Sequence, residues 1–261
     1  MLFRKLNLDW RYGLSELLIV VVGVFIALAA DGWLQQREDR VTEREYIERL
    51  VQDLRLDTAS VSNIMARTEE RARYCQVILD AYDSGQRSGS ASDFIEAVEF
   101  GNYFSYPSYS TTTIDELMST GNLRLVRSTE VKTTVSRYYE TIEWTEQFSE
   151  VFRPVQGALV PYKAEVLDLE QRYGLIQDGL SSSCGPTLSC DEGIPWAPSV
   201  LTVSEAEADL ALQRLLSKPE GRSLYASMAR IQAIHYASLA SIHKLANDSL
   251  ATLEQYAADG W

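Results

Sequence analysis

Residues 14–33 read LSELLIVVVGVFIALAADGW, and this stretch decides the fold. Its centre, Leu17 to Ala30, is an unbroken run of apolar or small residues. Aromatic residues stand on both sides, with Trp10 and Tyr12 before the run and Trp33 after it. A helix from Trp10 to Trp33 rises about 34 Å, enough to cross the hydrocarbon core of a bilayer and place an aromatic ring at each interface. The sequence therefore predicts a single membrane helix that carries one water-exposed domain.

Two other interpretations compete with an uncleaved anchor. A cleaved signal peptide fits the basic residues Arg4, Lys5 and Arg11, and Ala27-Leu28-Ala29 satisfies the small-x-small rule for cleavage. A buried core helix explains the length of the run but not its apolarity on all sides. We favour the anchor because the run is long for a signal peptide, Trp flanks both ends, and heptad-like polar sequence follows at once.

One face of the predicted membrane helix carries small residues. At about 100° per residue, Glu16 shares this face with Gly23, Ala27 and Ala30. The stripe resembles the small-xxx-small seams through which membrane helices pack, so it predicts self-association of the anchor. The alternative is that Gly and Ala are simply common in membrane helices.

The orientation of the anchor depends on its short N-terminal flank. Basic residues lie on both sides of the apolar run, but long domains are translocated largely regardless of charge, so the short flank should dominate. The predicted organisation is a short cytoplasmic flank at residues 1–12, a transmembrane helix at 13–33 and an extracytoplasmic helical-bundle domain at 34–261.

Composition limits the range of functions. The chain has 261 residues and a net charge of −13, which argues against binding to nucleic acid and to acidic lipid surfaces because both would repel it. Charged residues make up 23% and apolar residues 46%, values of a folded domain rather than a disordered tail. The part beyond the anchor is long enough for one sizeable domain or two small ones.

Two long amphipathic helices are predicted to form the spine of that domain. Apolar residues recur at steps of three, four or seven from Thr42 to Asp83 and again from Pro219 to Tyr256. Gly85 is available as a left-handed cap after the first helix. Rods of about forty residues are about 60 Å long and can pair along their length. The predicted fold class is all-α, a membrane helix that continues into an elongated helical bundle; a lapse of heptad regularity near residues 57–60 favours bundle core over a free coiled coil.

Shorter helices are predicted between the two rods from capping signals and stop signals. They run from Asp93 to about Phe104, from Thr113 to Gly121, from Ser128 to Pro154, from Tyr162 to Tyr173, and from Ser204, which forms a capping box with Glu207. Residues 174–203 form a long irregular segment, and loops of this length are usually functional or disordered.

The cysteines indicate the redox compartment. Cys184 and Cys190 lie close together in the irregular segment, and the Gly185-Pro186 turn between them can bring the two thiols together. We therefore predict a disulfide between them and an oxidising compartment. Cys75 falls on the apolar face of the first rod and is predicted to be a small buried hydrophobe.

Two parts of the chain carry a resemblance. The opening WRYGLSELLIVVVGVFIALAADGW with EREYIERLVQDLRLD, and later TTTIDELMSTGNLRLVRSTEVKTTVSRYYE, resemble a bacterial family of unknown function. In that family one N-terminal membrane helix precedes an E-Y-x-x-x-L-x-x-D-L-x-x-D helix and a T-x-x-E-L-x-x-S-G-x-L segment. The matching positions here are Glu45, Tyr46, Leu50, Asp53, Leu54 and Asp57, then Thr113, Glu116, Leu117, Gly121, Leu123, Val126, Tyr138 and Tyr139.

The resemblance covers about residues 10–60 and 110–140. The chain departs from the family at residues 29–32, where amide side chains are usual, and at Thr120, where Ser is usual. The resemblance implies a membrane-anchored, mostly helical protein of the bacterial envelope and supplies no activity.

The sequence contains little that indicates catalysis. Its two histidines, His235 and His243, lie eight residues apart on one predicted helix, about 80° from a shared face, and neither belongs to a metal-binding motif. Nucleophile-elbow, Walker A and Rossmann glycine patterns are absent from the sequence. We therefore predict no catalytic residues, no metal site and no cofactor.

The best candidate for ligand binding is an aromatic stretch after the first short helix. Tyr103, Phe104, Tyr106 and Tyr109, with Thr113, can form a pocket that is apolar in its body and polar at its tips. The alternative, which we favour, is that these rings cap one end of the bundle.

Together these features predict a single-pass protein of the bacterial inner membrane, with its N-terminus in the cytoplasm and its domain in the periplasm. We expect a non-catalytic structural or protein-interaction role, with a protein partner or self-association and no nucleic acid. A ligand-binding sensor bundle is the alternative, and a hydrolytic enzyme ranks third.

Overall fold

The computed structural model describes residues 10–168 and 203–259, and this part of the chain is helical with no strand. The predicted all-α fold class is therefore confirmed. The helices are α1 (Trp10–Ser84), α2 (Ala91–Phe100), α3 (Thr112–Ser119), η1 (Asn122–Leu125), α4 (Thr129–Ser149), η2 (Glu150–Phe152), α5 (Arg153–Val166), α7 (Glu205–Leu216) and α8 (Glu220–Ala258), where η denotes a 3₁₀ helix.

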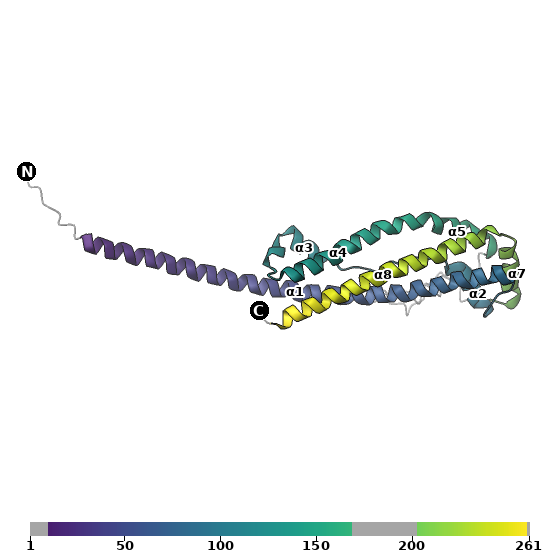
Figure 1. Ribbon diagram of the computed structural model, residues 1–261, viewed down its shortest axis with the longest axis horizontal. Helices are drawn as coiled ribbons and strands as arrows, with labels where there is room; N and C mark the ends of the chain where they lie inside the picture. The colour runs from purple at the N-terminus through teal and green to yellow at the C-terminus, as the bar shows by residue number, and fades with distance from the viewer. Residues whose placement is uncertain (1–9, 169–202, 260–261) are drawn as a thin grey trace, which may run out of the picture.

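Helix α1 joins the apolar segment to the folded domain without a break. Its 75 residues make a rod of about 110 Å, and Figure 1 shows its N-terminal part projecting alone from the bundle. Apolar side chains such as Leu18 (64% exposed) and Phe25 (68% exposed) have no protein neighbours to cover them. Among the described residues, α1 is the one helix long and apolar enough to cross a membrane, and none of its apolar window is buried.

Helices α1 and α8 run antiparallel and form the predicted spine of the bundle (Figure 1). Ion pairs mark both ends of this pairing: Arg222 to Asp83 (2.8 Å) at one end and Arg55 to Glu254 (2.6 Å) towards the other. Helix α4, followed by η2 and α5, lies along α8 as a third rod. We call the end nearest the apolar segment, with α3 and the end of α8, the proximal end, and the end with α2 and α7 the distal end.

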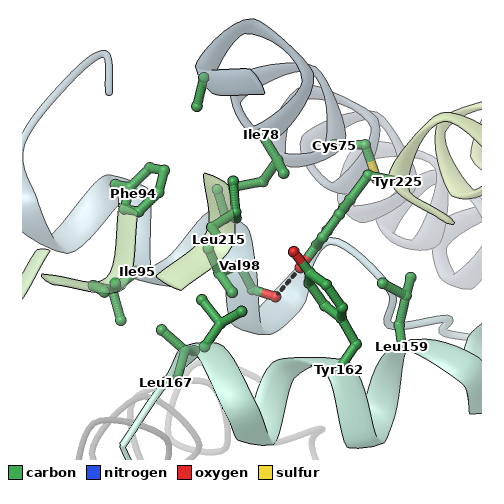
Figure 2. Packing of buried hydrophobic residues seen from close by; sticks show 14 of the residues in the cluster. Cys75, Ile78, Phe94, Ile95, Val98, Leu159, Tyr162, Leu167, Leu215 and Tyr225 are labelled. Atoms are coloured by element: carbon green, nitrogen blue, oxygen red, sulfur yellow. Dashed lines mark hydrogen bonds between the residues drawn. The ribbon is translucent and has the colours of Figure 1, made fainter. Parts of the chain in front are cut away.

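The core divides into two clusters along this length. The proximal cluster is built from α1, α3, α4 and α8, and its fully buried members include Ile47, Leu50, Leu54, Leu117, Tyr138 and Ile242. The distal cluster is built from α1, α2, α5, α7 and α8. Figure 2 shows its centre, where Tyr225 of α8 lies beside Cys75 of α1 and donates a hydrogen bond to the Val98 carbonyl (2.8 Å).

Most local predictions at helix ends are confirmed. Gly85 follows the last residue of α1 with φ +70°, and Gly121 follows α3 with φ +71°; both are left-handed positions that favour glycine. The capping box between Ser204 and Glu207 begins α7. The helix predicted to reach Phe104 ends earlier, because α2 stops at Phe100.

The predicted helix boundaries around the two prolines are wrong. Helix α4 ends at Ser149, before Pro154, and α5 begins at Arg153 with Pro154 in its first turn, where the missing N–H has no helical partner to lose. Pro161 then lies inside α5 instead of separating two helices. Its ring is exposed, so the bundle tolerates a residue that normally breaks a helix.

A close approach in the first turn of α8 requires glycine. The hydroxyl groups of Tyr82 and Tyr162 share a hydrogen bond directly over Gly221, and a Cβ at that position would lie 2.2 Å from each hydroxyl oxygen. The Tyr82 hydroxyl also lies 2.9 Å from the Lys218 carbonyl, so it has little room to retreat.

We expect Gly221→Ala to destabilise the protein by about 1–3 kcal/mol, because both tyrosines must move. Gly157→Ala is the control: Gly157 lies on the exposed side of α5 with open space around it, so alanine there should be neutral or slightly stabilising. Urea unfolding of the full-length protein in detergent, followed by circular dichroism, gives both values. Equal stability of the two variants would contradict the close-approach argument.

Candidate functional site

An extended segment, residues 101–111, joins α2 at the distal end to α3 at the proximal end. We call it the connecting segment. It has no regular secondary structure beyond its first turn, yet most of its residues are buried or half-buried. Buried peptide groups need hydrogen-bond partners. Because the segment cannot supply them from its own backbone, side chains of the surrounding helices must do so.

On the proximal side the partners come from α1 and α4. Asp57 accepts a hydrogen bond from the Ser110 N–H (2.8 Å), and Ser60 accepts one from the Ser108 N–H (2.9 Å). The Tyr139 hydroxyl donates to the Ser110 carbonyl (3.0 Å). The residues where the heptad pattern lapses are therefore those that hold the connecting segment.

On the distal side the partners come from α8. The Gln232 amide donates to the Tyr103 carbonyl (2.9 Å). The His235 ring nitrogen Nε2 lies 3.2 Å from the Ser105 carbonyl, and since a carbonyl oxygen only accepts, Nε2 carries the proton. Burial lowers the pKa of His235, the hydrogen bond to Ser105 opposes this shift, and the nearby Arg71 adds to it.

Asp57 is the most enclosed carboxylate of the proximal half. Its side chain is fully buried and also accepts a hydrogen bond from the Tyr138 hydroxyl (2.9 Å). Burial raises the pKa of Asp57, the hydrogen bonds from Ser110 and Tyr138 oppose that rise, and the charge of Asp53 adds to it. The pKa of Tyr138 is raised in turn, first by burial and then by the charge of Asp57. The hydrogen bond between Asp57 and Tyr138 joins α1 to α4 inside the proximal cluster.

A second buried carboxylate closes the proximal end. Glu43 of α1 is 1% exposed and accepts three hydrogen bonds: from the Arg127 N–H (2.7 Å), from Arg127 Nε (2.9 Å) and from the Tyr256 hydroxyl (2.6 Å). Because Arg127 precedes α4 and Tyr256 lies near the end of α8, this carboxylate ties all three rods together.

A half-exposed network of hydrogen bonds joins α1 to α3 at the proximal end. Glu116 accepts hydrogen bonds from the Tyr46 hydroxyl (2.8 Å) and from Arg49 (2.6 Å), and the Asn122 amide donates to the Tyr46 hydroxyl (3.1 Å). The hydrogen bond from Arg49 holds the pKa of Glu116 below its usual range, with a further contribution from Tyr46.

The structure thereby brings together the two stretches that carry the resemblance. Residues of the first motif (Tyr46, Leu50, Leu54, Asp57) and of the second (Glu116, Leu117, Val126, Tyr138) meet in the proximal cluster or through the hydrogen bonds above. The geometry gives these positions a packing function between α1, α3 and α4.

The five residues predicted to bind a ligand do not line one pocket. Phe104 packs against the distal cluster, whereas Tyr109 packs against the proximal cluster and Thr113 is buried in α3. Tyr106 is half-exposed. The aromatic rings contact each other and their neighbours: Phe104 stacks with Tyr106 and Phe152, and both Phe104 and Tyr106 make T-shaped contacts with His235. Ligand binding by this set stays a prediction.

Tyr103 packs against a buried ion pair at the distal end, between Lys163 and Glu99. Lys163 of α5 donates to the Glu99 carbonyl (2.6 Å) and to the Glu99 carboxylate (3.0 Å), and both side chains are almost fully buried. The Lys163 ammonium lies 4.6 Å from the centre of the Tyr103 ring, whose hydroxyl donates to Glu99 (3.1 Å). This arrangement locks α2 to α5 and encloses the ammonium, so it gives the lysine no access to a substrate.

The remaining chemically reactive groups are also enclosed or isolated. Cys75 is buried, its thiol donates to the Gly101 carbonyl (3.1 Å), and burial raises the pKa of Cys75 to about 12, as expected of an inert packing residue. His235 and His243 do not converge: His243 pairs with Asn247 on the same helix. Over residues 10–168 and 203–259, no cluster of His, Cys, Asp or Glu is suited to hold a metal ion. The predicted disulfide between Cys184 and Cys190 lies outside the described residues.

Two surface depressions lie away from Cys75, the histidines and the Lys163–Glu99 pair, and the second is lined in part by Glu43 and Arg127. One, of about 380 Å³, lies on the outer face of α4 and is lined by Lys132, Thr133, Ser136, Arg137 and Glu140. The other, of about 200 Å³, lies between α1 and η1 at the proximal end. The residues of the predicted membrane stripe (Glu16, Gly23, Ala27, Ala30) are exposed, and nothing lies within 4 Å of a Cβ built at Gly23, so that face is open.

Comparison with protein-family models, with curated proteins and with solved structures finds no match for this chain.

Sequence reasoning missed the buried carboxylates Glu43 and Asp57. A signal was present, because both lie in register with the apolar stripe of α1, at steps of three or four from Ile47, Leu54 and Val61. A charged residue at a stripe position indicates either a break in the core or a buried partner. Only the packed structure shows that Ser110, Tyr138, Arg127 and Tyr256 supply those partners.

We expect Asp57→Ala to destabilise the protein by about 3 kcal/mol, because it leaves the Ser110 N–H and the Tyr138 hydroxyl buried without an acceptor. Asp53→Ala is a matched control one turn earlier: one carboxylate oxygen of Asp53 is buried with no hydrogen-bond partner among the described residues, so its loss should cost little. Tyr138→Phe completes a double-mutant cycle with Asp57→Ala. Strictly additive effects in urea unfolding would contradict a direct Asp57–Tyr138 interaction.

His235 should make stability depend on pH in a predictable direction. Its pKa is lowered in the folded state, so both states are neutral above about pH 6.5, while below it the unfolded chain takes up a proton more readily. The stability due to His235 is therefore present at neutral pH and is lost as the pH falls through the folded-state pKa. We expect the advantage of the wild type over His235→Gln to shrink between pH 7.5 and pH 5. His243→Gln serves as the comparison variant, because it removes an imidazole of the same helix that contacts Asn247 and not the connecting segment.

Proposed function

We propose that this chain is a single-pass membrane protein whose helical bundle has a structural or protein-interaction role and not a catalytic one. The observation that supports this most is the continuity of α1. One unbroken helix contains the uncovered apolar segment and half of the bundle spine. An apolar surface of that length, exposed on every side, is suited to lipid and not to water.

The state of the polar groups supports a non-catalytic role. Asp57, Gln232 and His235 are engaged with the backbone of the connecting segment, and Lys163 is engaged with Glu99. A general base or a nucleophile needs an accessible side chain next to a space for substrate. These groups are enclosed in protein, and the two depressions lie elsewhere.

The packing of the aromatic stretch favours interaction over ligand sensing. A sensor of the predicted kind needs Tyr103 to Tyr109 to surround a shared cavity. In the structure these residues divide between the two ends of the connecting segment, and Phe104 and Tyr106 fill the space beside His235. We place the protein in a bacterial inner membrane on the basis of the family resemblance. The flanking charges and the predicted disulfide favour residues 1–12 in the cytoplasm and the bundle in the periplasm.

Membrane insertion is tested by alkaline carbonate extraction of membranes that contain the full-length protein. We expect the intact chain to stay in the pellet, because the part of α1 between Trp10 and Trp33 rises about 34 Å and has an apolar centre. Fusions at the C-terminus test the orientation: alkaline phosphatase should be active there and green fluorescent protein should not fluoresce. A soluble product beginning near Ala30 would establish a cleaved signal peptide instead.

The interaction role is tested by crosslinking on the same membranes. We expect discrete crosslinked species that contain either a partner protein or a second copy of this chain. If the small-residue stripe mediates self-association, Gly23→Ile should reduce the dimeric species, whereas Val24→Ile, on another face, should not. A chain that gives no crosslinked species under conditions that capture a known complex would argue against this role.

A further inference from the structure

The depression at the proximal end is lined by arginines. Its wall is formed by α1 on one side and by η1 with the residues that follow it on the other. The lining residues are Gln36, Asp39, Arg40, Glu43, Arg124, Leu125 and Arg127, and the volume is about 200 Å³. The depression therefore lies between two parts of the chain. One is the part of α1 that follows the apolar segment, and the other is the first part of the bundle that packs against α1.

The charges in this depression are not balanced within the described part of the chain. The Glu43 carboxylate is buried and already paired with Arg127 and Tyr256. Arg40 and Arg124 are exposed and form no ion pair there, and Asp39 is the one acidic lining residue without an arginine partner. Two guanidinium groups against one carboxylate leave a single excess positive charge, which a singly charged anion would neutralise.

The position of the depression along α1 identifies which anion it meets. Trp33 marks the expected membrane–water interface. The guanidinium carbon of Arg37 lies 5.8 Å from the centre of the Trp33 ring. Arg40 follows Trp33 by two turns, about 10 Å along the axis. Because Cα–Cβ bonds in a helix tilt towards its N-terminus, the Arg40 side chain leans towards the apolar segment. The depression therefore lies at the level of lipid headgroups, or just above it.

We propose that Arg40 and Arg124 bind the headgroup phosphate of an anionic phospholipid in the bilayer that holds α1. This inference rests on the proposed membrane anchoring. Guanidinium groups bind phosphate oxygens through paired, charge-assisted hydrogen bonds. The net charge of −13 opposes general binding to acidic surfaces. It does not prevent a local contact, because charges more than about 8 Å away are largely screened at physiological salt.

The test uses the full-length protein reconstituted in phosphatidylcholine vesicles with trace spin-labelled lipid. Electron paramagnetic resonance measures the fraction of labelled lipid immobilised by the protein. We expect phosphatidylglycerol to be immobilised in preference to phosphatidylcholine, and Arg40→Gln with Arg124→Gln to abolish this preference. The matched control, Arg73→Gln with Arg230→Gln, removes the same charge from exposed distal positions without an ion pair in the described structure and should keep the preference.

The outcomes distinguish failure of the phosphate site from failure of the membrane anchor. An unchanged preference in the Arg40/Arg124 variant, or an equal loss in the control, would overturn the phosphate site while carbonate-resistant insertion still supports the anchor. Failure of the wild type to resist carbonate in these vesicles would overturn the anchor itself. Inorganic phosphate at matched ionic strength should leave the preference intact; if it displaces the labelled lipid, the site recognises free phosphate and the lipid assignment is wrong.

Discussion

The bundle depends on keeping an extended peptide inside a helical core. The connecting segment crosses from the distal to the proximal end among α1, α4 and α8, and its peptide groups have no regular partners of their own. A buried peptide group left without a partner costs roughly 1–3 kcal/mol, so a few such losses would consume much of the stability of a typical domain. The rods therefore carry polar side chains at positions that would otherwise be apolar, and Asp57, Gln232 and His235 are examples.

The same requirement explains why α1 is a long, uninterrupted helix. Its stripe supplies apolar residues to both core clusters, and within the proximal cluster it also supplies Asp57 and Ser60 to the connecting segment. A break in α1 would separate the two clusters and release the segment. Helix α1 also continues without a break towards the N-terminus, into the apolar run. Because residues 31–42 alone separate the apolar run from Glu43, where packing begins, the bundle is held close to the layer that surrounds the apolar run.

Much of the fold could be predicted from the sequence because it is recorded in local patterns. The 3.6-residue period gave both rods of the spine, and the caps at Gly85, Gly121 and Ser204 gave three helix ends. Pro161 misled the prediction, because whether a proline ends a helix depends on what the helix packs against.

The candidate site was harder to predict because it depends on long-range packing. Phe104 and Tyr109 are close in sequence, but an extended chain rises about 3.3 Å per residue, so five residues place them about 17 Å apart, against different clusters. Closeness in sequence predicts a shared pocket only if the chain folds back, and Pro107 alone does not decide whether it does. Conversely, Asp57 and Tyr138 lie 81 residues apart and meet directly, a pairing that no local pattern in a single sequence records.

The buried polar contacts also determine the register of the rods. Apolar stripes with a regular repeat can pack in several alignments that differ by one or two turns, since one leucine fits much like another. A shift of α1 by one turn, about 5.4 Å, would move Asp57 away from Ser110 and Tyr138 and Glu43 away from Arg127 and Tyr256. Two buried carboxylates would then be unpaired, at a cost of several kcal/mol each, while the apolar contacts changed little. The carboxylates thus do what the apolar stripe cannot: they select one alignment of α1, α4 and α8, and with it the distance between the apolar segment and each end of the bundle.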